Sequence, residues 1–302
     1  EYVELLVCSR EGINLTNVER KELADIIVPL IKKGQSIYQI LSAHPEIKQC
    51  EKTIYNYIDQ GVFNDFGIQN ISLKEKVKRK QFKDKYKKRK EKACYDGRKY
   101  EDYLLYKSQN PNKFTTEMDT VMNSISGPYI QTFIFEKTQF MIGILKNSKT
   151  SEKMAKTIDV FEKEFDYQTF EKLFGLLLTD RGTEFEKSEL FVFNQETGKK
   201  RLEIFYCDSM ASYQKPHVEN NHNYVRDIIT NSLSIDNITQ EDLDLVFSHI
   251  NSTPRESLNG KTPYEMFEFL YGVETIDTFN IKKIERDDVI LKPYLLKHLF
   301  HK

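Results

Sequence analysis

The chain has 302 residues, a formal net charge of −1 at pH 7, an apolar share of 39% and a charged share of 30%. This length allows one large domain or two ordinary ones and is enough to bury a core. No apolar run approaches the roughly 20 residues that span a bilayer, so we expect no membrane contact. The four cysteines are far apart without paired spacing, which disfavours a zinc site or a disulfide framework and favours a reducing compartment.

The charge is distributed unevenly along the chain. The stretch from Lys74 to Lys99 contains fourteen Lys or Arg and four Asp or Glu. Its net charge is therefore +10, which leaves −11 for the remainder of the chain. This stretch, the basic strap, is typical either of a polyanion-binding element or of a solvated linker. The strap cations that we expect to contact DNA phosphates are Lys76, Arg79, Lys80, Lys87, Lys88 and Arg89.

The first segment predicts three short helices. The stretch Thr16–Glu19 has the spacing of a capping box, and apolar residues then recur at helical spacing until Gly34. Ser36 has the character of an N-cap for a second helix, which His44 and Pro45 end. A third helix is expected over 50–60, with apolar residues on its inner side.

Three short helices with a tight break before the last are typical of a helix-turn-helix, and equally of an ordinary three-helix bundle. In the first interpretation the third helix presents Lys52, Thr53 and Asn56 to the major groove. Asn can hydrogen-bond adenine with both amide atoms, and Lys can reach guanine or phosphate. The adjoining basic strap favours this interpretation.

From residue 114 the pattern changes to strands and helices in alternation. We expect strands over 114–122, 129–135, 140–145, 176–178 and 202–206, and helices over 151–165 and from 217 onward. Three strands, a helix, two further strands and a helix predict an α/β domain with a mixed sheet.

Three carboxylates stand out in this second half. Asp119 lies within a strand, where a carboxylate is costly unless it is paired or bound to a metal. Asp180 follows the buried strand, and Glu219 lies near a helix start. If the three converged, their oxygens would suit one or two Mg²⁺ ions and phosphoryl-transfer chemistry. Glu117, Glu184 and Asp208 are neighbouring carboxylates of the same type.

Several motifs, in order, carry a family resemblance. They are EMDTV at 117–121, LTDRGTEF at 178–185, YCDSMASYQKPHVENNH at 206–222, HINSTPR at 249–255, and KKGQS at 32–36 with KTIYNYID at 52–59. From about Ser9 to its C-terminus the chain resembles bacterial insertion-sequence transposases of the IS-thirty family, which have a DDE catalytic domain of the RNase H-like integrase type.

The resemblance implies a fold, a site and an activity. The fold would be an RNase H-like mixed five-stranded sheet flanked by helices, preceded by an all-α helix-turn-helix domain. Asp119, Asp180 and Glu219 would be the catalytic metal ligands for Mg²⁺ or Mn²⁺, with two ions expected. Lys215, Asn223 and Arg226 would contact DNA.

The implied partners are double-stranded DNA, as inverted-repeat ends and as target, and further copies of the chain in a dimer or higher oligomer. The implied location is the bacterial cytoplasm, in association with the nucleoid. The implied reaction is strand cleavage with water, then strand transfer by the freed 3′-hydroxyl. The family usually has Asn where Arg181 stands, so we expect this cation to lie beside the metal site and weaken it.

Domain boundaries follow from these patterns. We expect a helix-turn-helix domain over 1–72, a basic linker over 73–112, a catalytic domain over 113–272 and a C-terminal tail over 273–302. The chain begins at Glu1 without the family's further N-terminal segment, so a truncated copy is one interpretation. Two rival functions stay open, namely a decayed or domesticated transposase that only binds DNA, and an RNase H-like nuclease without strand transfer.

Overall fold

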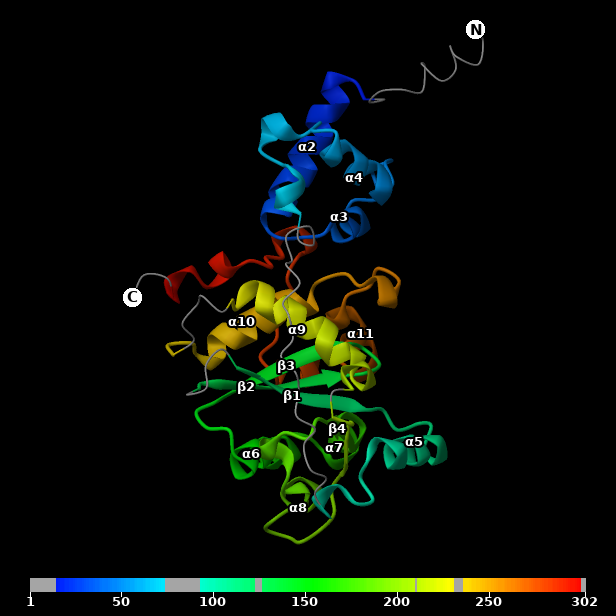
Figure 1. Ribbon diagram of the computed structural model, residues 1–302, viewed down its shortest axis with the longest axis vertical. Helices are drawn as coiled ribbons and strands as arrows, with labels where there is room; N and C mark the ends of the chain where they lie inside the picture. The colour runs from blue at the N-terminus through cyan, green and yellow to red at the C-terminus, as the bar shows by residue number, and fades with distance from the viewer. Residues whose placement is uncertain (1–14, 74–92, 123–126, 210, 231–235, 300–302) are drawn as a thin grey trace. The chain divides into compact units, whose positions relative to one another are not determined.

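The computed structural model describes residues 15–73, 93–122, 127–209, 211–230 and 236–299, without the side chains of Ser212 and Glu219 (Figure 1). The chain divides into two compact units. Unit 1 comprises Glu1–Phe82 with Arg286–Ile290, and unit 2 comprises Lys83–Glu285 with Leu291–Lys302.

Unit 1 contains the three helices that the sequence predicts: α2 (Asn17–Lys32), α3 (Ile37–Ala43) and α4 (Glu51–Asp59). The capping box that begins α2 is present, because the Thr16 backbone N–H donates to the Glu19 carboxylate (2.8 Å) and the Glu19 N–H donates to the Thr16 hydroxyl (3.2 Å). Two short 3₁₀ helices follow, η1 (Asn64–Phe66) and η2 (Asn70–Ser72).

The core of unit 1 is formed by one apolar face from each helix and by the segment after α4. Its best-buried side chains include Ile27, Ile40, Ile54, Phe63 and Ile68, each at most 1% exposed. Because the buried residues of α2, α3 and α4 repeat at helical spacing, the predicted helices and the core agree.

Unit 1 also includes a segment from the far end of the chain, around η7 (Arg286–Asp288). The buried Gln35 donates from Nε2 to the carbonyls of Arg286 (2.9 Å) and Val289 (3.1 Å). The Arg286 guanidinium donates to the Ser42 carbonyl (2.8 Å). These bonds belong to a packed segment, whereas the sequence suggested a simple tail over 273–302.

Unit 2 is organised around a five-stranded sheet in the order β3-β2-β1-β4-β5. The strands are β1 (Thr116–Met122), β2 (Tyr129–Phe135), β3 (Phe140–Lys146), β4 (Leu176–Thr179) and β5 (Glu203–Tyr206). The first three pair antiparallel, while β1, β4 and β5 run parallel. A mixed five-stranded sheet flanked by helices confirms the predicted RNase H-like fold class.

Helices cover both faces of this sheet. Phe133 packs on Phe161 and Phe174 of the green helices α6 (Ser151–Glu164) and α7 (Tyr167–Phe174). The neighbouring Thr132 points to the opposite face, because side chains alternate along a strand, and it bonds a side chain of α9 (Pro216–Ile228). Figure 1 shows α9 on one side of the strands and α6 and α7 on the other.

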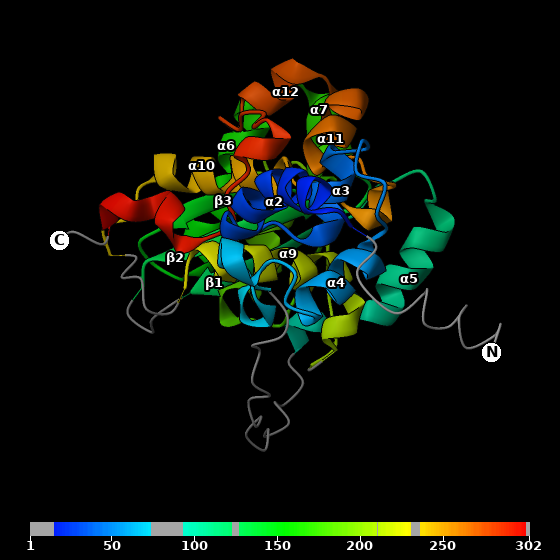
Figure 2. The same cartoon turned by 90° about the horizontal axis from the view of Figure 1, so that it is seen from above.

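The edge strand β3 is covered by α10 (Gln240–Asn251), next to which it lies in Figure 2. The Asn251 amide accepts from the Met141 N–H and donates to the Met141 carbonyl, both at 2.8 Å. A Cβ on Gly143 would lie 2.1 Å from the Phe247 ring, so only glycine allows this approach. The covered edge cannot pair with another strand.

The remaining elements of unit 2 complete its two layers. They are η3 (Ala93–Tyr95), α5 (Tyr100–Gln109), η4 (Thr183–Phe185), α8 (Ser188–Val192), η5 (Ser212–Gln214), η6 (Glu256–Leu258), α11 (Pro263–Tyr271), α12 (Val273–Asp277) and η8 (Pro293–Leu299). Across the described ranges, none of the helices combines the length and the apolar character that crossing a bilayer requires.

Two stretches that the sequence suggested as linker and tail are packed parts of unit 2. Within 73–112, Tyr103 of α5 is 8% exposed, packs on Phe205 with 6.0 Å between ring centroids, and bonds the Thr115 hydroxyl (2.9 Å). Within 273–302, Ile276 and Leu296 are fully buried. The polar composition of both stretches is typical of connecting segments. Their few large apolar side chains become buried only against the sheet, which supplies the apolar surface that they cover.

The buried Arg201 allows a test of this packing. Its guanidinium, 3% exposed, pairs with Asp159 (2.7 Å) and Glu162 (2.8 Å) of α6 and donates to two backbone carbonyls. Arg201→Met leaves both carboxylates without a cation, so we expect the free energy of unfolding in urea to fall by about 3 kcal/mol. Lys163→Met removes only an exposed pair with Glu196 and should cost less than about 1 kcal/mol. Equal losses would contradict this assignment.

Candidate active site at the carboxyl ends of β1 and β4

The parallel pairing of β1 with β4 places two of the predicted acids side by side. Glu117 pairs with Leu178, so the same register continued by two residues places Asp119 beside Asp180. Neighbouring strands lie about 4.8 Å apart. Asp180 directly follows β4 and is exposed, whereas Asp119 lies inside β1 with its side chain 23% exposed.

The buried Lys215 supplies the cation that balances these acids. Its ammonium, on a residue 5% exposed, lies 3.0 Å from Asp119 Oδ2 and donates to the Met118 carbonyl at 3.4 Å. Lys215 immediately precedes α9, so this ion pair joins the start of that helix to β1. The sequence predicted Lys215 as a phosphate contact, but here its ammonium is taken up by Asp119.

The electrostatics of the two aspartates differ. Burial opposes ionisation of Asp119, but the ammonium of Lys215, together with the hydrogen bond from the Thr120 N–H, outweighs it and holds the pKa of Asp119 below its usual range. Desolvation by the surrounding protein and repulsion from Asp119 raise the pKa of Asp180. Burial also lowers the pKa of His222 to about 4, so this imidazole is neutral at pH 7.

Two further contacts hold α9 against the sheet. The buried Glu117 accepts a hydrogen bond from the Val218 N–H (2.8 Å), which satisfies a free donor in the first turn of the helix. The His222 imidazole lies 3.0 Å from the Thr132 hydroxyl, next to Asp119 in the sheet register. Burial raises the pKa of Glu117 to about 7.

Arg255 follows α10 in the chain and also holds α9 in place. Its guanidinium donates to the Asn221 side chain (3.0 Å) and the Ile250 carbonyl (3.3 Å), and lies 3.9 Å from the centroid of the Tyr224 ring. The residue is 7% exposed, and no carboxylate in the described structure pairs with it. Arg255 ends the HINSTPR motif, so this motif has a structural role beside the predicted site.

Arg181 does not point toward the acids as the sequence suggested. Its Nε donates to the Cys207 carbonyl (3.0 Å), a terminal nitrogen pairs with Asp208 (2.9 Å), and the guanidinium lies 5.2 Å from the Tyr95 ring centroid. Cys207 and Asp208 directly follow β5, so these partners hold the Arg181 side chain on that side of the loop. The expected cation at the metal site is therefore engaged elsewhere.

The loop after β4 explains Gly182. The sequence suggested a tight turn, but Gly182 has an ordinary φ of −66°. A Cβ there would instead lie 2.6 Å from Glu184 Oε2 and 3.0 Å from Asp180 Oδ1. Its own N–H donates to Asp180 Oδ1 (3.0 Å). The glycine is needed because two carboxylates approach the backbone, and the buried Glu184 pairs with Lys149 (2.9 Å).

The third predicted ligand lies in α9. Glu219 is in the first turns of this helix, one turn before His222, which faces Asp119. The Glu219 side chain lies outside the described part of the structure. Asn223 and Arg226 are exposed on the same helix.

No metal centre is formed by the side chains that the structure describes, since they include no group of three or more His, Cys, Asp or Glu placed to hold an ion. Asp119 and Asp180 nevertheless offer the hard oxygen donors that Mg²⁺ prefers. The donor chemistry of these two residues fits the ion that the sequence resemblance implies.

The predicted DNA contacts in unit 1 differ in accessibility. Lys52 and Asn56 are exposed on α4, while Thr53 is half-buried with its hydroxyl 3.2 Å from the Cys50 sulfur. All six strap cations predicted to contact DNA lie outside the described residues.

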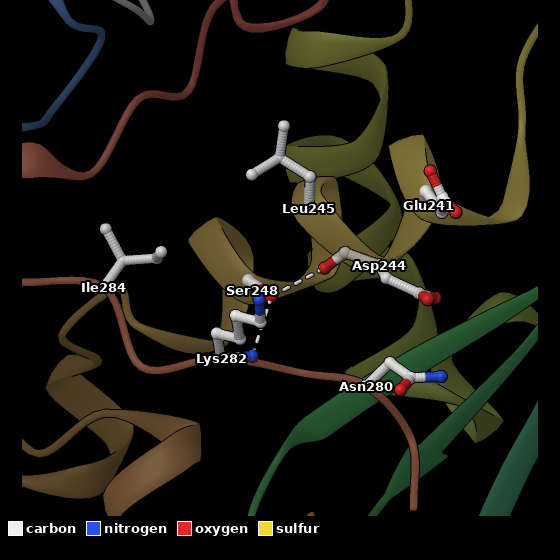
Figure 3. Close-up of a pocket in the computed structure, with 7 residues that line it drawn as sticks. All are labelled: Glu241, Asp244, Leu245, Ser248, Asn280, Lys282 and Ile284. Atoms are coloured by element: carbon white, nitrogen blue, oxygen red, sulfur yellow. Dashed lines mark hydrogen bonds between the residues drawn. The ribbon is translucent and has the colours of Figure 1, made fainter. Parts of the chain in front are cut away.

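A surface cavity lies elsewhere in unit 2, between α10 and residues 280–284 (Figure 3). Its volume is about 440 Å³, and Figure 3 shows Asp244, Ser248 and Lys282 around it. The Ser248 hydroxyl donates to the Asp244 carbonyl (2.6 Å) and accepts from the Lys282 N–H (2.9 Å). None of the predicted catalytic residues lines this cavity, so it does not define the candidate site.

Comparisons with known proteins support the sequence resemblance. No protein-family model matches the chain. A stretch of 92 residues is 33% identical to the transposase InsI of insertion sequence element IS30A from Escherichia coli (strain K12), and it covers 30% of this chain and 23% of that one. The InsI transposases of IS30C and IS30D match equally. Over this stretch the predicted resemblance is confirmed, although it spans less than a quarter of the relatives' length.

Two solved structures are also similar to the chain. The catalytic core domain of BIV integrase has a TM-score of 0.37 and 17% identity, covering 54% of this chain and 96% of that one. The HTLV-2 integrase catalytic core domain in complex with magnesium has a TM-score of 0.34 and 15% identity, covering 51% and 95%.

The ion pair between Lys215 and Asp119 can be tested by a double-mutant cycle in a metal-free buffer. Lys215→Met leaves the Asp119 carboxylate without its cation, and we expect the free energy of unfolding to fall by about 3 kcal/mol. Adding Asp119→Asn should restore at least about 1 kcal/mol, because the remaining side chain is neutral. Lys113→Met, which breaks a half-exposed pair with Glu171, should cost less than about 1 kcal/mol. Additive effects at Lys215 and Asp119 would refute the pairing.

Proposed function

We propose that this chain, a relative of the IS-thirty transposases, is a DNA transposase that cleaves and joins DNA strands at the carboxyl ends of β1 and β4. The observation that carries the proposal is the adjacency of Asp119 and Asp180 on parallel strands, beneath the helix that carries Glu219. The similarity to InsI transposases supports the same reading.

Asp119, Asp180 and Glu219 would hold Mg²⁺ or Mn²⁺, and two ions are part of the proposal. When bound, such ions supply Lewis-acid activation of a nucleophile and stabilise charge on a leaving oxygen. Glu117, Lys215 and Arg255 keep α9 in place over β1, and in this proposal that placement would bring the third acid close to the first two. Positioning and charge are most of what phosphoryl transfer requires from a protein.

The proposed reaction has two steps at phosphorus. A water oxygen attacks the phosphodiester at the element's end, the bond from phosphorus to the 3′-oxygen breaks, and a free 3′-hydroxyl remains. That hydroxyl then attacks a target phosphodiester, forms a new P–O bond and releases the target's own 3′-oxygen as a hydroxyl. Neither step consumes an oxidant or a nucleotide cofactor.

The DNA contacts in the proposal come from both units. Lys52 and Asn56 are exposed on α4 and would read base edges as the last helix of a helix-turn-helix. Asn223 and Arg226 are exposed on α9, one and two turns beyond Glu219, and would contact the strand near the reacting phosphate. We propose that the chain works as a dimer or larger oligomer, because two DNA ends are joined in one event.

The activity is tested with DNA that carries the inverted repeats flanking the element's own coding sequence. Asp119→Asn, Asp180→Asn and Glu219→Gln should each lower strand cleavage and joining by about 10²-fold or more, because each removes a charged ligand worth several kcal/mol in the transition state. Asp208→Asn is the matched control, since this carboxylate pairs with Arg181.

Gel analysis of the products separates the proposal from its rivals. Cleaved but unjoined strands would indicate a nuclease without strand transfer. Binding of the repeats with no cleavage in any divalent metal would indicate a protein that only binds DNA. Full activity in Glu219→Gln would remove Glu219 from the site.

Arg181 should not oppose metal binding, because Asp208, the Cys207 carbonyl and the Tyr95 ring engage its guanidinium. We expect Arg181→Gln to bind Mn²⁺ within about threefold of the wild-type affinity, and Asp180→Asn to bind it at least about tenfold more weakly. Titration of the free Mn²⁺ signal by electron paramagnetic resonance measures both. A gain of tenfold or more in Arg181→Gln would show that this cation acts on the site after all.

A further inference from the structure

Three lysines of unit 2 form a group that the proposed site does not use. Lys146 is the last residue of β3, and Lys153 and Lys156 lie one turn apart on α6. Lys146 is half-buried, and the other two are exposed. We call these three residues the lysine surface.

Lys146 lies at the same end of the sheet as the acids, but its side chain points to the other face. Asp119 pairs with Thr132, which pairs with Gly143, and Lys146 is three residues beyond Gly143, so it faces α6 while Asp119 faces α9. Lys146 pairs with Tyr129, and Tyr129 pairs with Met122 at the end of β1. Asp119 lies three residues before that end, two strands away. Two strand spacings and three residues along a strand separate the Cα atoms of Lys146 and Asp119 by roughly 14 Å.

The start of α6 is fastened to the loop that carries Asp180. Lys149 pairs with the buried Glu184 (2.9 Å), and the Ser151 hydroxyl donates to the Thr183 carbonyl (3.2 Å). Thr183 and Glu184 form η4, directly after the Asp180 loop. The lysine surface is therefore held at a fixed place relative to the candidate site.

Four other charged residues of α6 are paired with charges of the segment 187–201. Glu152 pairs with Lys187, Asp159 and Glu162 pair with Arg201, and Lys163 pairs with Glu196. Lys146, Lys153 and Lys156 have no ion-pair partner among the residues that the structure describes. The fold thus leaves three positive charges together on the α6 face of the sheet, near the strand ends that carry the acids.

These charges also act on one another. Burial, followed by repulsion from Lys153 and Lys156, lowers the pKa of Lys146 to about 8. The ammonium groups are therefore held close enough to interact, without a carboxylate that would relieve the repulsion. A bound anion would relieve it, and separate cations along an edge suit a chain of anions better than a single one.

We propose that the lysine surface binds the phosphodiester backbone of a DNA strand that passes the carboxyl end of β3 on the α6 face of the sheet. The inference rests on the proposed function and adds a binding surface to it.

The test uses the full chain and a DNA duplex that carries the inverted repeat. In the variant with Lys146→Gln, Lys153→Gln and Lys156→Gln, the slope of log affinity against log salt should become shallower by about 2 to 3, since each lost phosphate contact changes it by about 0.9. The matched control replaces Lys163, Lys187 and Lys200, which pair with carboxylates, by Gln and removes the same charge. Its slope should change by less than about 1.

A second measurement needs no variant. Acetylation of lysines in the wild-type chain, read by mass spectrometry, should slow several-fold at Lys146, Lys153 and Lys156 when the duplex is added, and should stay unchanged at Lys163. Equal slopes for the two triple variants, or absence of protection by DNA, would overturn the inference. Protection by inorganic phosphate but not by DNA would overturn it as well.

The two proposals can fail separately. If the wild-type chain cleaves DNA but the lysine triple variant keeps the wild-type salt slope, the lysine surface alone is refuted. If Mn²⁺ does not bind and no cleavage occurs while DNA still protects the three lysines, the proposed reaction is refuted and the surface is supported as a DNA contact.

Discussion

The parallel pairing of β1 with β4 is the constraint on which the candidate site depends. It sets Asp119 and Asp180 beside each other, and two carboxylates at one strand spacing repel strongly. The ammonium of Lys215 balances that repulsion, and Lys215 can do so only because α9 begins directly over β1. A slip of one residue in the strand pairing would turn Asp119 to the other face of the sheet and separate the pair.

The anchoring of α9 follows from the same constraint. Glu117, two residues before Asp119, points to the same face and accepts a backbone hydrogen bond from the first turn of the helix. Arg255 also holds α9, through Asn221 and Tyr224. The three contacts place the helix by charge and hydrogen bonds, and each would be costly to leave unpaired because the groups are buried.

In unit 2 several of the charged side chains near the sheet have a partner of opposite charge. Three carboxylates of α6 pair with Lys187 or Arg201, while Lys146, Lys153 and Lys156 have no such partner among the described residues. The ammonium of Lys215 pairs with Asp119, and the guanidinium of Arg181 pairs with Asp208. Among the described residues, the cations near these strand ends that have no carboxylate partner include Lys146 at the end of β3 and Lys153 near the start of α6.

Much of the fold could be predicted from the sequence. The capping boxes, the helical spacing in unit 1 and the strand patterns around Asp119 and Asp180 are local, and local propensity decides them. Residues 100–109 and 273–299 were harder, because their polar composition hides a few large side chains that are buried only once the sheet exists. Tyr103 and Leu296 show this clearly.

Within the site, the sequence by itself determined which residue types are present and in what order: an acid inside a strand, an acid after a strand, and an acid near a helix start. The direction of Arg181, the use of Lys215 as an internal cation and the anchoring roles of Glu117 and Arg255 were decided only by the tertiary structure. The reason is physical. A charged side chain takes the partner that lies nearest in space, and strand register and helix placement fix that partner, whereas spacing along the chain does not.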